Sequence, residues 1–187
     1  MTTITRRAAL SGMLAATAGL AAGCGNGVGS PGASVIDARV ASTMNFLYSN
    51  YPATTQLRDK STGILVMPVM TKAALGAGGS FGRGSLLVNG QPIDYYSAAQ
   101  ASLGFQLGAQ QYAQVLFFMT NDALFRFRSS PGWEAGGDIE YALNDQGANL
   151  SATTTTSTSP VVGVIFGQAG LMAGASIEGT KYTRIIP

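Results

Sequence analysis

The stretch Ser85-Leu86-Leu87-Val88-Asn89-Gly90-Gln91-Pro92-Ile93 carries the strongest indication of how this chain folds. Asn-Gly between two apolar runs is the dipeptide that most favours a two-residue hairpin turn. The next segment, residues 93–108, is long, and from Leu103 to Gly108 apolar residues alternate with glycine and glutamine. A period of two places apolar side chains on one face of a strand. The centre of the chain is therefore predicted to form antiparallel strands.

Strand-like segments continue on both sides of this hairpin. We expect residues 63–67 to form a short buried strand that Pro68 stops. The glycine-rich segment 79–84 is interpreted as a second hairpin turn, which divides residues 73–88 into two strands. The remaining predicted strands cover residues 112–119, 133–143, 161–166, 171–177 and 181–185.

Helices are predicted near the start of this domain and in its middle. Apolar residues recur every three or four positions at Ile36, Val40, Met44, Leu47 and Tyr51. The helix is expected to begin at Ser34, with Asp37 as its capping-box partner, and to end before Pro52. It packs on a sheet or lies on a membrane surface; for the second role its polar face has only one cation, Arg39. A shorter helical turn is expected over residues 54–60.

The mid-chain helix is predicted to be capped by Thr120-Asn121-Asp122 and to run through Ser129. Leu124 and Phe125 are expected to face inward, and Arg126 and Arg128 to lie nearer solvent. Together these patterns predict an α+β fold that is mostly β. We expect a curled antiparallel sheet, barrel-like or sandwich-like, with an N-terminal helix and a short mid-chain helix.

The composition of the 187 residues excludes several kinds of chemistry. Because the chain has no histidine, it lacks imidazole bases, His-dependent nucleophiles and His-ligated metals. Its single cysteine forms no internal disulfide and no cysteine-ligated metal site. The net charge of +2 is too small to indicate a nucleic-acid binder. We expect no enzyme activity, cofactor, metal or nucleic-acid partner.

Residues 1–23 resemble an export signal. Arg6-Arg7 precedes an apolar stretch that is short for a permanent membrane span. The two arginines also resemble the twin-arginine motif, so export in the folded or the unfolded state remains open. Removal of this segment leaves nine basic and nine acidic side chains, so the mature domain is formally neutral.

The segment Leu20-Ala21-Ala22-Gly23-Cys24 resembles a bacterial lipobox, in which the cysteine thiol accepts diacylglycerol. The alternative is an ordinary signal peptide with a chance cysteine. Lipidation predicts a stable membrane anchor, because several acyl chains bind a bilayer much more tightly than a single chain does. Gly25 gives no signal for retention at the inner membrane, so we expect the outer membrane, facing the periplasm. Residues 24–33 form a flexible tether and residues 34–187 the domain.

Charged side chains supply the candidate sites. Lys72, Arg83, Arg126 and Arg128 either converge into a cationic patch for lipid headgroups or are scattered surface cations. Glu134, Asp138 and Glu140 either gather on one strand face, suited to calcium or acid–base work, or form the wet face of a half-buried strand.

Several segments, in this order, resemble the SYLF domain family. They are Gly63-Ile64-Leu65-Val66-Met67-Pro68, Thr71-Lys72-Ala73, the glycine-rich run from Gly78 to Leu87, Tyr95-Tyr96, Ser102 to Gln110, Phe118 to Leu124, Gly132-Trp133-Glu134 and Leu171 to Lys181. The resemblance spans about residues 34 to 187.

The resemblance implies a non-enzymatic domain that binds membrane lipids, with Lys72 as the first candidate for a headgroup contact. Glu134 and Asp138 also fall in matching positions, without a role. The phosphoinositide and actin binding of eukaryotic members is not expected here, because the chain lacks their basic N-terminal extension and carries an export signal.

We therefore interpret the chain as a bacterial lipoprotein of the cell envelope, with Cys24 as its lipidation site and a domain that binds membrane lipid. The first alternative is a structural or assembly lipoprotein that binds an envelope protein through an exposed sheet edge. The Thr-rich run 151–159, interpreted as a solvated strand or loop rather than a linker, is one such edge. A hydrolase that uses Glu134, Asp138 or Glu140 is the second alternative.

Overall fold

A computed structural model describes residues 30–136, 139–141, 159–167, 170–171, 177 and 179–187. In chain order the elements are α2 (Gly32–Asn50), α3 (Thr54–Lys60), β1 (Gly63–Val88), β2 (Gln91–Phe118), α4 (Asn121–Ser129), β3 (Trp133–Glu134), β4 (Ile139–Tyr141), β5 (Val161–Gly167), β6 (Gly170–Leu171) and β7 (Lys181–Ile185). Within these residues the strands form one seven-stranded sheet.

The centre of the fold is an antiparallel ribbon of β1 and β2, two strands far longer than usual. Their pairing begins with Val88 opposite Gln91 at the hairpin turn and continues to Gly63 opposite Phe118. Asn89 and Gly90 both have positive φ angles, 51° and 75°, as a type I′ turn requires. The predicted Asn89-Gly90 hairpin is therefore confirmed.

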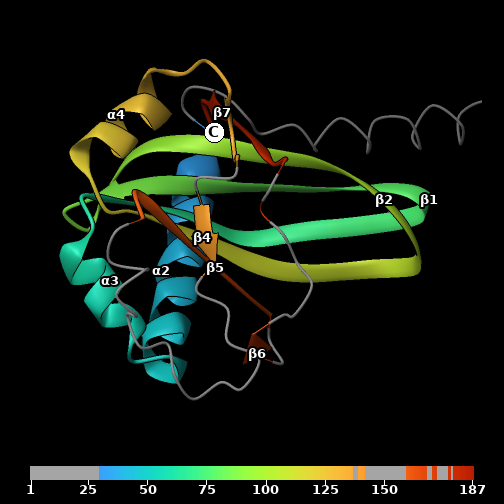
Figure 1. The fold of residues 1–187 in the computed structure, drawn as a ribbon, viewed down its shortest axis with the longest axis horizontal. Helices are drawn as coiled ribbons and strands as arrows, with labels where there is room; N and C mark the ends of the chain where they lie inside the picture. The colour runs from blue at the N-terminus through green and yellow to red at the C-terminus, as the bar shows by residue number, and fades with distance from the viewer. Residues whose placement is uncertain (1–29, 137–138, 142–158, 168–169, 172–176, 178) are drawn as a thin grey trace, which may run out of the picture.

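The ribbon bends back on itself, which gives the sheet its curl (Figure 1). The prediction that Pro68 stops the first strand is wrong, because β1 continues through it with a register shift between Met67 and Met70. A bulge of this kind accommodates a residue without an N–H group. The segment 112–119, predicted as a separate strand, forms the end of β2.

The glycine-rich segment 79–84 is likewise not a turn, because it stays paired with β2. Its glycines instead allow close approach of backbone. A Cβ atom added to Gly82 would lie 2.5 Å from the carbonyl oxygen of Val69, and one added to Gly84 would overlap that of Val66. The returning half of β1 thus packs against the first half of the same strand.

The remaining strands extend the sheet from β2, in the order β3-β7-β2-β5-β4. The pairs are antiparallel except β4–β5, which is parallel. The single strand predicted over residues 133–143 is wrong, because β3 pairs with β7 and β4 pairs with β5 on the other side of the sheet. Alternation with a period of two indicates a strand but does not identify its partner.

Two hydrophobic cores lie on the two faces of this curled sheet. The inner core fills the bend and includes Leu65, Leu116, Phe118, Phe127 and Tyr182. The outer core lies beneath α2, whose buried residues are Ile36, Val40, Met44 and Leu47. The predicted apolar stripe and its packing on a sheet are therefore confirmed. The fold class is also confirmed: a mostly antiparallel, half-barrel sheet with an N-terminal helix and a short mid-chain helix.

Of the two predicted helix N-caps, one is confirmed and one is wrong. The side chain of Thr120 accepts a hydrogen bond from the Ala123 N–H at 3.2 Å, which confirms the cap of α4. The capping box at Ser34 is wrong, since α2 begins after Pro31 without a side-chain cap. Asp37 instead accepts a hydrogen bond from the Tyr95 hydroxyl at 2.9 Å.

Three further strands or helices match their predicted residues: α3, β5 and β7. The inward orientation of Phe125 is wrong, because it is 69% exposed and Ala123 and Phe127 face the core instead. The side chains from Leu103 to Gly108, most of the Thr-rich run and the strand predicted beyond Leu171 lie outside the described residues. Of the helices described here, none has the length and apolar character needed to cross a membrane.

Candidate functional site

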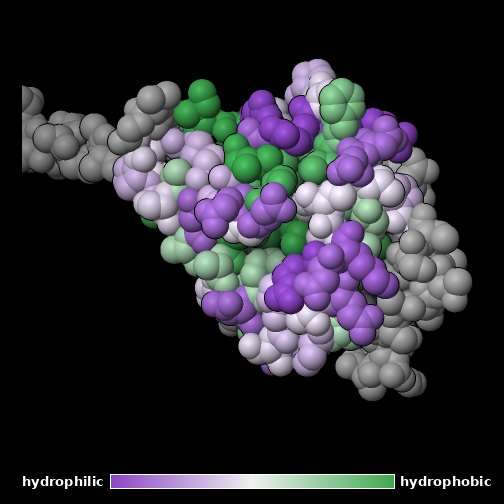
Figure 2. All heavy atoms as spheres, turned by 90° about the vertical axis from the view of Figure 1, so that its left-hand side faces the viewer, coloured by the Kyte–Doolittle hydropathy of each residue, from purple (hydrophilic) through white to green (hydrophobic). Residues whose placement is uncertain are grey.

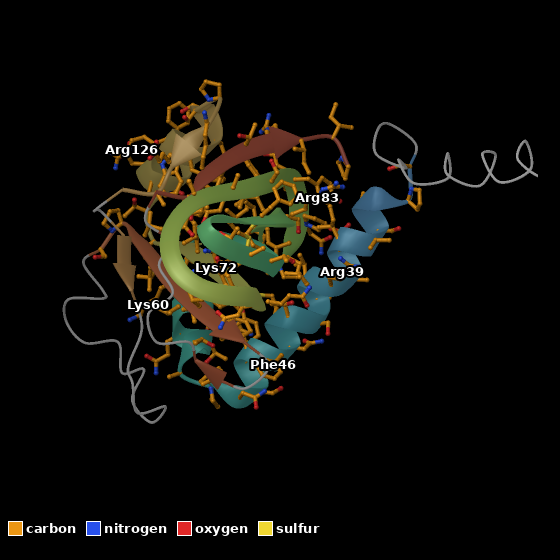
Figure 3. The ribbon with its side chains drawn as sticks, turned by 90° about the vertical axis from the view of Figure 1, so that its right-hand side faces the viewer. Arg39, Phe46, Lys60, Lys72, Arg83 and Arg126 are labelled. Carbon is orange, nitrogen blue, oxygen red and sulfur yellow. The ribbon has the colours of Figure 1, made fainter. Side chains whose placement is uncertain are left out.

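The cations predicted from the sequence fall into separate regions rather than one patch (Figure 3). Lys72 lies on the first half of β1, opposite Gln110, and Arg83 lies on the returning half, opposite Ser97. Arg126 and Arg128 lie in the last turn of α4.

The α4 arginines are held by carboxylates. Arg126 Nη2 lies 3.0 Å from Asp122 Oδ2, one helical turn earlier. Arg128 Nε lies 3.2 Å from Asp94 Oδ2, and Arg184 donates to the same oxygen at 2.6 Å. The Asp94 side chain is only 15% exposed, whereas the side chains of Arg128 and Arg184 are 44% and 53% exposed, so water screens this three-membered network in part. Polar side chains dominate this side of the molecule, with smaller apolar groups between them (Figure 2).

Beneath α4 the molecule is tightly packed by aromatic rings. The Phe127 ring lies 4.8 Å from that of Phe118, 4.7 Å from Tyr96 and 5.3 Å from Trp133. Burial raises the pKa of Tyr96. The arginines of α4 therefore lie above a tightly packed part of the fold.

A hollow surface lies on the other side, between α2 and the bulged part of β1; we call it the α2 groove. It consists of two adjoining hollows of about 490 and 400 Å³ that share Arg39, Pro68 and Val69. The helix contributes Val35, Arg39, Ser42 and Phe46. The sheet contributes Pro68, Val69, Phe81, Arg83, Tyr112 and Phe166.

The α2 groove combines cations with apolar surface. Arg39 and Arg83 line it, and none of its described lining residues is acidic. Val35 is 47% exposed and Phe81 52% exposed. The Phe46 ring stacks on Phe166 at 5.7 Å. Such a surface suits a ligand with an apolar part and a negative charge.

The sequence prediction found Arg83 but passed over Arg39. Val35, Arg39, Ser42 and Phe46 follow one another at spacings of four, three and four residues, so they share a second face of α2. This spacing was readable from the sequence. The sequence does not show that this face of α2 lies against a bulge of β1 at Pro68, and this neighbour is what forms the groove.

Another hollow, of about 650 Å³, lies on the opposite side of α2 near the hairpin turn. Asp37, Tyr48, Arg58 and Asp59 line it. Arg58 pairs with Asp59 at 2.8 Å and lies 5.1 Å above the Tyr48 ring. Burial raises the pKa of Tyr48 to about 12. Because this hollow carries charges of both signs, we place the candidate site at the α2 groove.

The predicted carboxylate trio does not come together on one strand. Glu134 lies on β3, opposite Lys181, and Glu140 lies on β4, at the other end of the strand order. Asp138 and Cys24 lie outside the described residues. Over the part of the chain that the structure describes, no three acidic or cysteine side chains are grouped to hold a metal ion.

Comparison with known families adds an independent finding. Residues 99–184 match the profile of the Ysc84 family, described as Las17-binding protein actin regulators. This match agrees with the resemblance to the SYLF family that the sequence motifs indicate. No curated protein matches the chain. The Ysc84 segment begins within β2 and includes Arg126 and Arg128, whereas Arg39, Lys72 and Arg83 precede it. The match supports a relationship to a lipid-binding and actin-regulator-like family.

Proposed function

We propose that this chain is an exported bacterial lipoprotein, anchored through Cys24, whose non-enzymatic domain binds membrane lipid through the α2 groove. The observation that carries the proposal is the pairing of Arg39 and Arg83 with the exposed side chains of Val35 and Phe81. Amphipathic surfaces of this kind insert apolar groups at the lipid interface and place cations among the headgroups.

The position of the tether supports this orientation. Pro31 and Gly32, at the start of α2, line the same end of the groove as Phe81 and Arg83. Five residues lie between Cys24 and Ser30, and the six Cα-to-Cα steps span at most about 20 Å when extended. A membrane that holds the acyl chains of Cys24 therefore lies within reach of this end of the groove. The proposed location is the outer membrane, facing the periplasm.

Each cation near an anionic bilayer contributes about 1 kcal/mol of attraction. Two arginines and two exposed apolar side chains give modest affinity, enough to orient a domain that the anchor already holds. The neutral charge of the mature chain is compatible with this role, because Arg126 and Arg128 are neutralised locally by the carboxylates of Asp122 and Asp94.

The test is flotation of the chain carrying Cys24→Ser on vesicles of neutral and of anionic lipid. We expect salt-sensitive binding to anionic vesicles only. Arg39→Glu with Arg83→Glu should weaken it about tenfold or more. The matched control, Arg126→Glu with Arg128→Glu, should change binding less than about twofold, provided that circular dichroism shows both doubles folded. Lys72→Ala, at a third position, should weaken it at most about fivefold.

Equal losses in the two double variants would contradict a site at the α2 groove. Absence of binding to either vesicle would leave the acyl chains as the membrane contact. The alternative, a structural or assembly lipoprotein that binds an envelope protein, would then become the leading function.

A further inference from the structure

We propose that the α2 groove holds the alkyl chain of a single anionic amphiphile, a fatty acid or a monoacyl phosphate. This inference rests on the proposed function, because it assigns to the lipid-binding surface a ligand that enters it as a monomer. Adsorption on a bilayer needs only exposed side chains, whereas the groove also offers an elongated hollow.

The dimensions of the groove fit one chain. Its two hollows, about 490 and 400 Å³, lie within the range of small-molecule sites. Along the helix they extend from Gly32 to Phe46, a distance of about 21 Å at the helical rise per residue. One leaflet of a bilayer has a hydrocarbon depth of about 15 Å. The groove is therefore longer than one lipid chain in its leaflet.

The chemistry of the groove changes along its length. The hollow near the start of α2 is lined by both Arg39 and Arg83, whereas the hollow beyond Arg39 is lined by the aromatic rings of Phe46, Tyr112 and Phe166. Burial raises the pKa of Tyr112, so its phenol stays neutral there. An anionic headgroup between the two arginines would place the alkyl chain along the aromatic end.

Charge and backbone chemistry favour an amphiphile over a peptide. No described lining residue carries a negative charge that would repel a carboxylate or phosphate. On the sheet side the chain bulges at Pro68, which has no N–H group to pair with an added strand. The walls therefore favour an alkyl chain, which makes no hydrogen bonds, over a peptide backbone.

The experiment titrates the chain carrying Cys24→Ser with cis-parinaric acid, a fluorescent fatty acid, below its micelle concentration and without vesicles. Saturated carboxylates of increasing length then compete for the site. We expect roughly fourfold tighter binding per added methylene until the groove is full, followed by a plateau. Ser42→Trp should fill the groove and weaken binding at least tenfold. Ser49→Trp, two turns further along the same helix and outside the groove, should leave it unchanged.

A charge variant supplies the second measurement. Arg39→Gln should weaken binding of a carboxylate about fivefold and leave the affinity of the alcohol of equal length unchanged. Equal effects of the two tryptophan variants, absence of binding, or affinity independent of chain length would each overturn the inference. Vesicle binding that persists without monomer binding would overturn it while leaving the proposed function intact. Loss of both would contradict the proposed function itself.

Discussion

The two sides of the ribbon use arginine in opposite ways. On the α4 side, Arg126, Arg128 and Arg184 contact the carboxylates of Asp122 and Asp94 above a packed aromatic cluster. On the α2 side, Arg39 and Arg83 line a hollow that contains exposed apolar side chains. Within the described residues no carboxylate lies within 4.0 Å of the Arg39 guanidinium.

This difference shows that the neighbours of a cation, rather than its residue type, decide its role. An arginine whose charge a partly buried carboxylate neutralises contributes to stability and little to an external field. The charge of Arg39, which lies beside apolar surface without such a carboxylate among the described residues, remains available to a ligand. The comparison therefore predicts which substitutions change binding and which change the free energy of unfolding.

The largest expected effect comes from the fold-back of β1, on which both sides depend. Gly84 lies directly after Arg83 and opposite Tyr96 of the α4 side. A Cβ at this position would overlap the Val66 carbonyl oxygen and come within 2.8 Å of the Met67 sulfur. Gly84→Ala should therefore lower the free energy of unfolding by about 3 kcal/mol, measured by urea denaturation.

Gly136→Ala is the matched control for this prediction. A Cβ added at Gly136 meets no atom within 4 Å, and its φ is not in the positive range. The substitution should change the free energy of unfolding by less than about 0.5 kcal/mol. If both alanine variants were equally stable, the close packing of β1 against itself would be wrong, and with it the separation of the two sides.

The second prediction converts the α4 side toward the chemistry of the α2 side. Asp94→Asn keeps the shape of the side chain but removes the charge that Arg128 and Arg184 share. The free energy of unfolding should fall by about 1.5 kcal/mol. Binding to anionic vesicles should change less than about twofold, because the proposed membrane contact is the α2 groove and Arg128 and Arg184 lie on the other side.

Asp122→Asn provides the comparison for Asp94→Asn, because its pair with Arg126 is mostly exposed. The substitution should lower the free energy of unfolding by less than about 0.5 kcal/mol. Denaturation and vesicle flotation measure both quantities. A clear gain in binding from Asp94→Asn would show that the α4 side also contacts the membrane and would contradict a site confined to the α2 groove.

Local sequence patterns predicted much of this fold but little of the site. The Asn89-Gly90 turn, the apolar stripe of α2 and the Thr120 cap depend on neighbours within a few residues, and all three are confirmed. The segment 79–84 was misinterpreted because glycine serves tight turns and close packing alike, and only the distant Val66 distinguishes them.

The site depends on contacts that no short pattern contains. Arg39 and Arg83 are far apart in sequence and line the same hollow because β1 bends back (Figure 1) and packs against α2. The grouping of Arg83 with Arg126 and Arg128 rested on charge alone, whereas Asp94, which holds Arg128, comes from β2. To identify which charges pair across the fold, the three-dimensional structure is therefore needed.

The smallest prediction compares how the two helices begin. The Thr120 hydroxyl oxygen accepts from the Ala123 N–H, whereas the Ser34 hydroxyl donates to the Pro31 carbonyl at 2.8 Å and caps no N–H group. Thr120→Ala should cost about 1 kcal/mol of unfolding free energy, and Ser34→Ala less than about 0.5 kcal/mol. Thermal and urea denaturation of both variants measure the difference. Equal losses of unfolding free energy in the two variants would indicate that Ser34 also caps its helix.

The two helices are fixed in place in different ways. Because α4 holds the arginines that pair with carboxylates, its first turn needs a fixed geometry, whereas α2 is held along its length by its buried apolar residues.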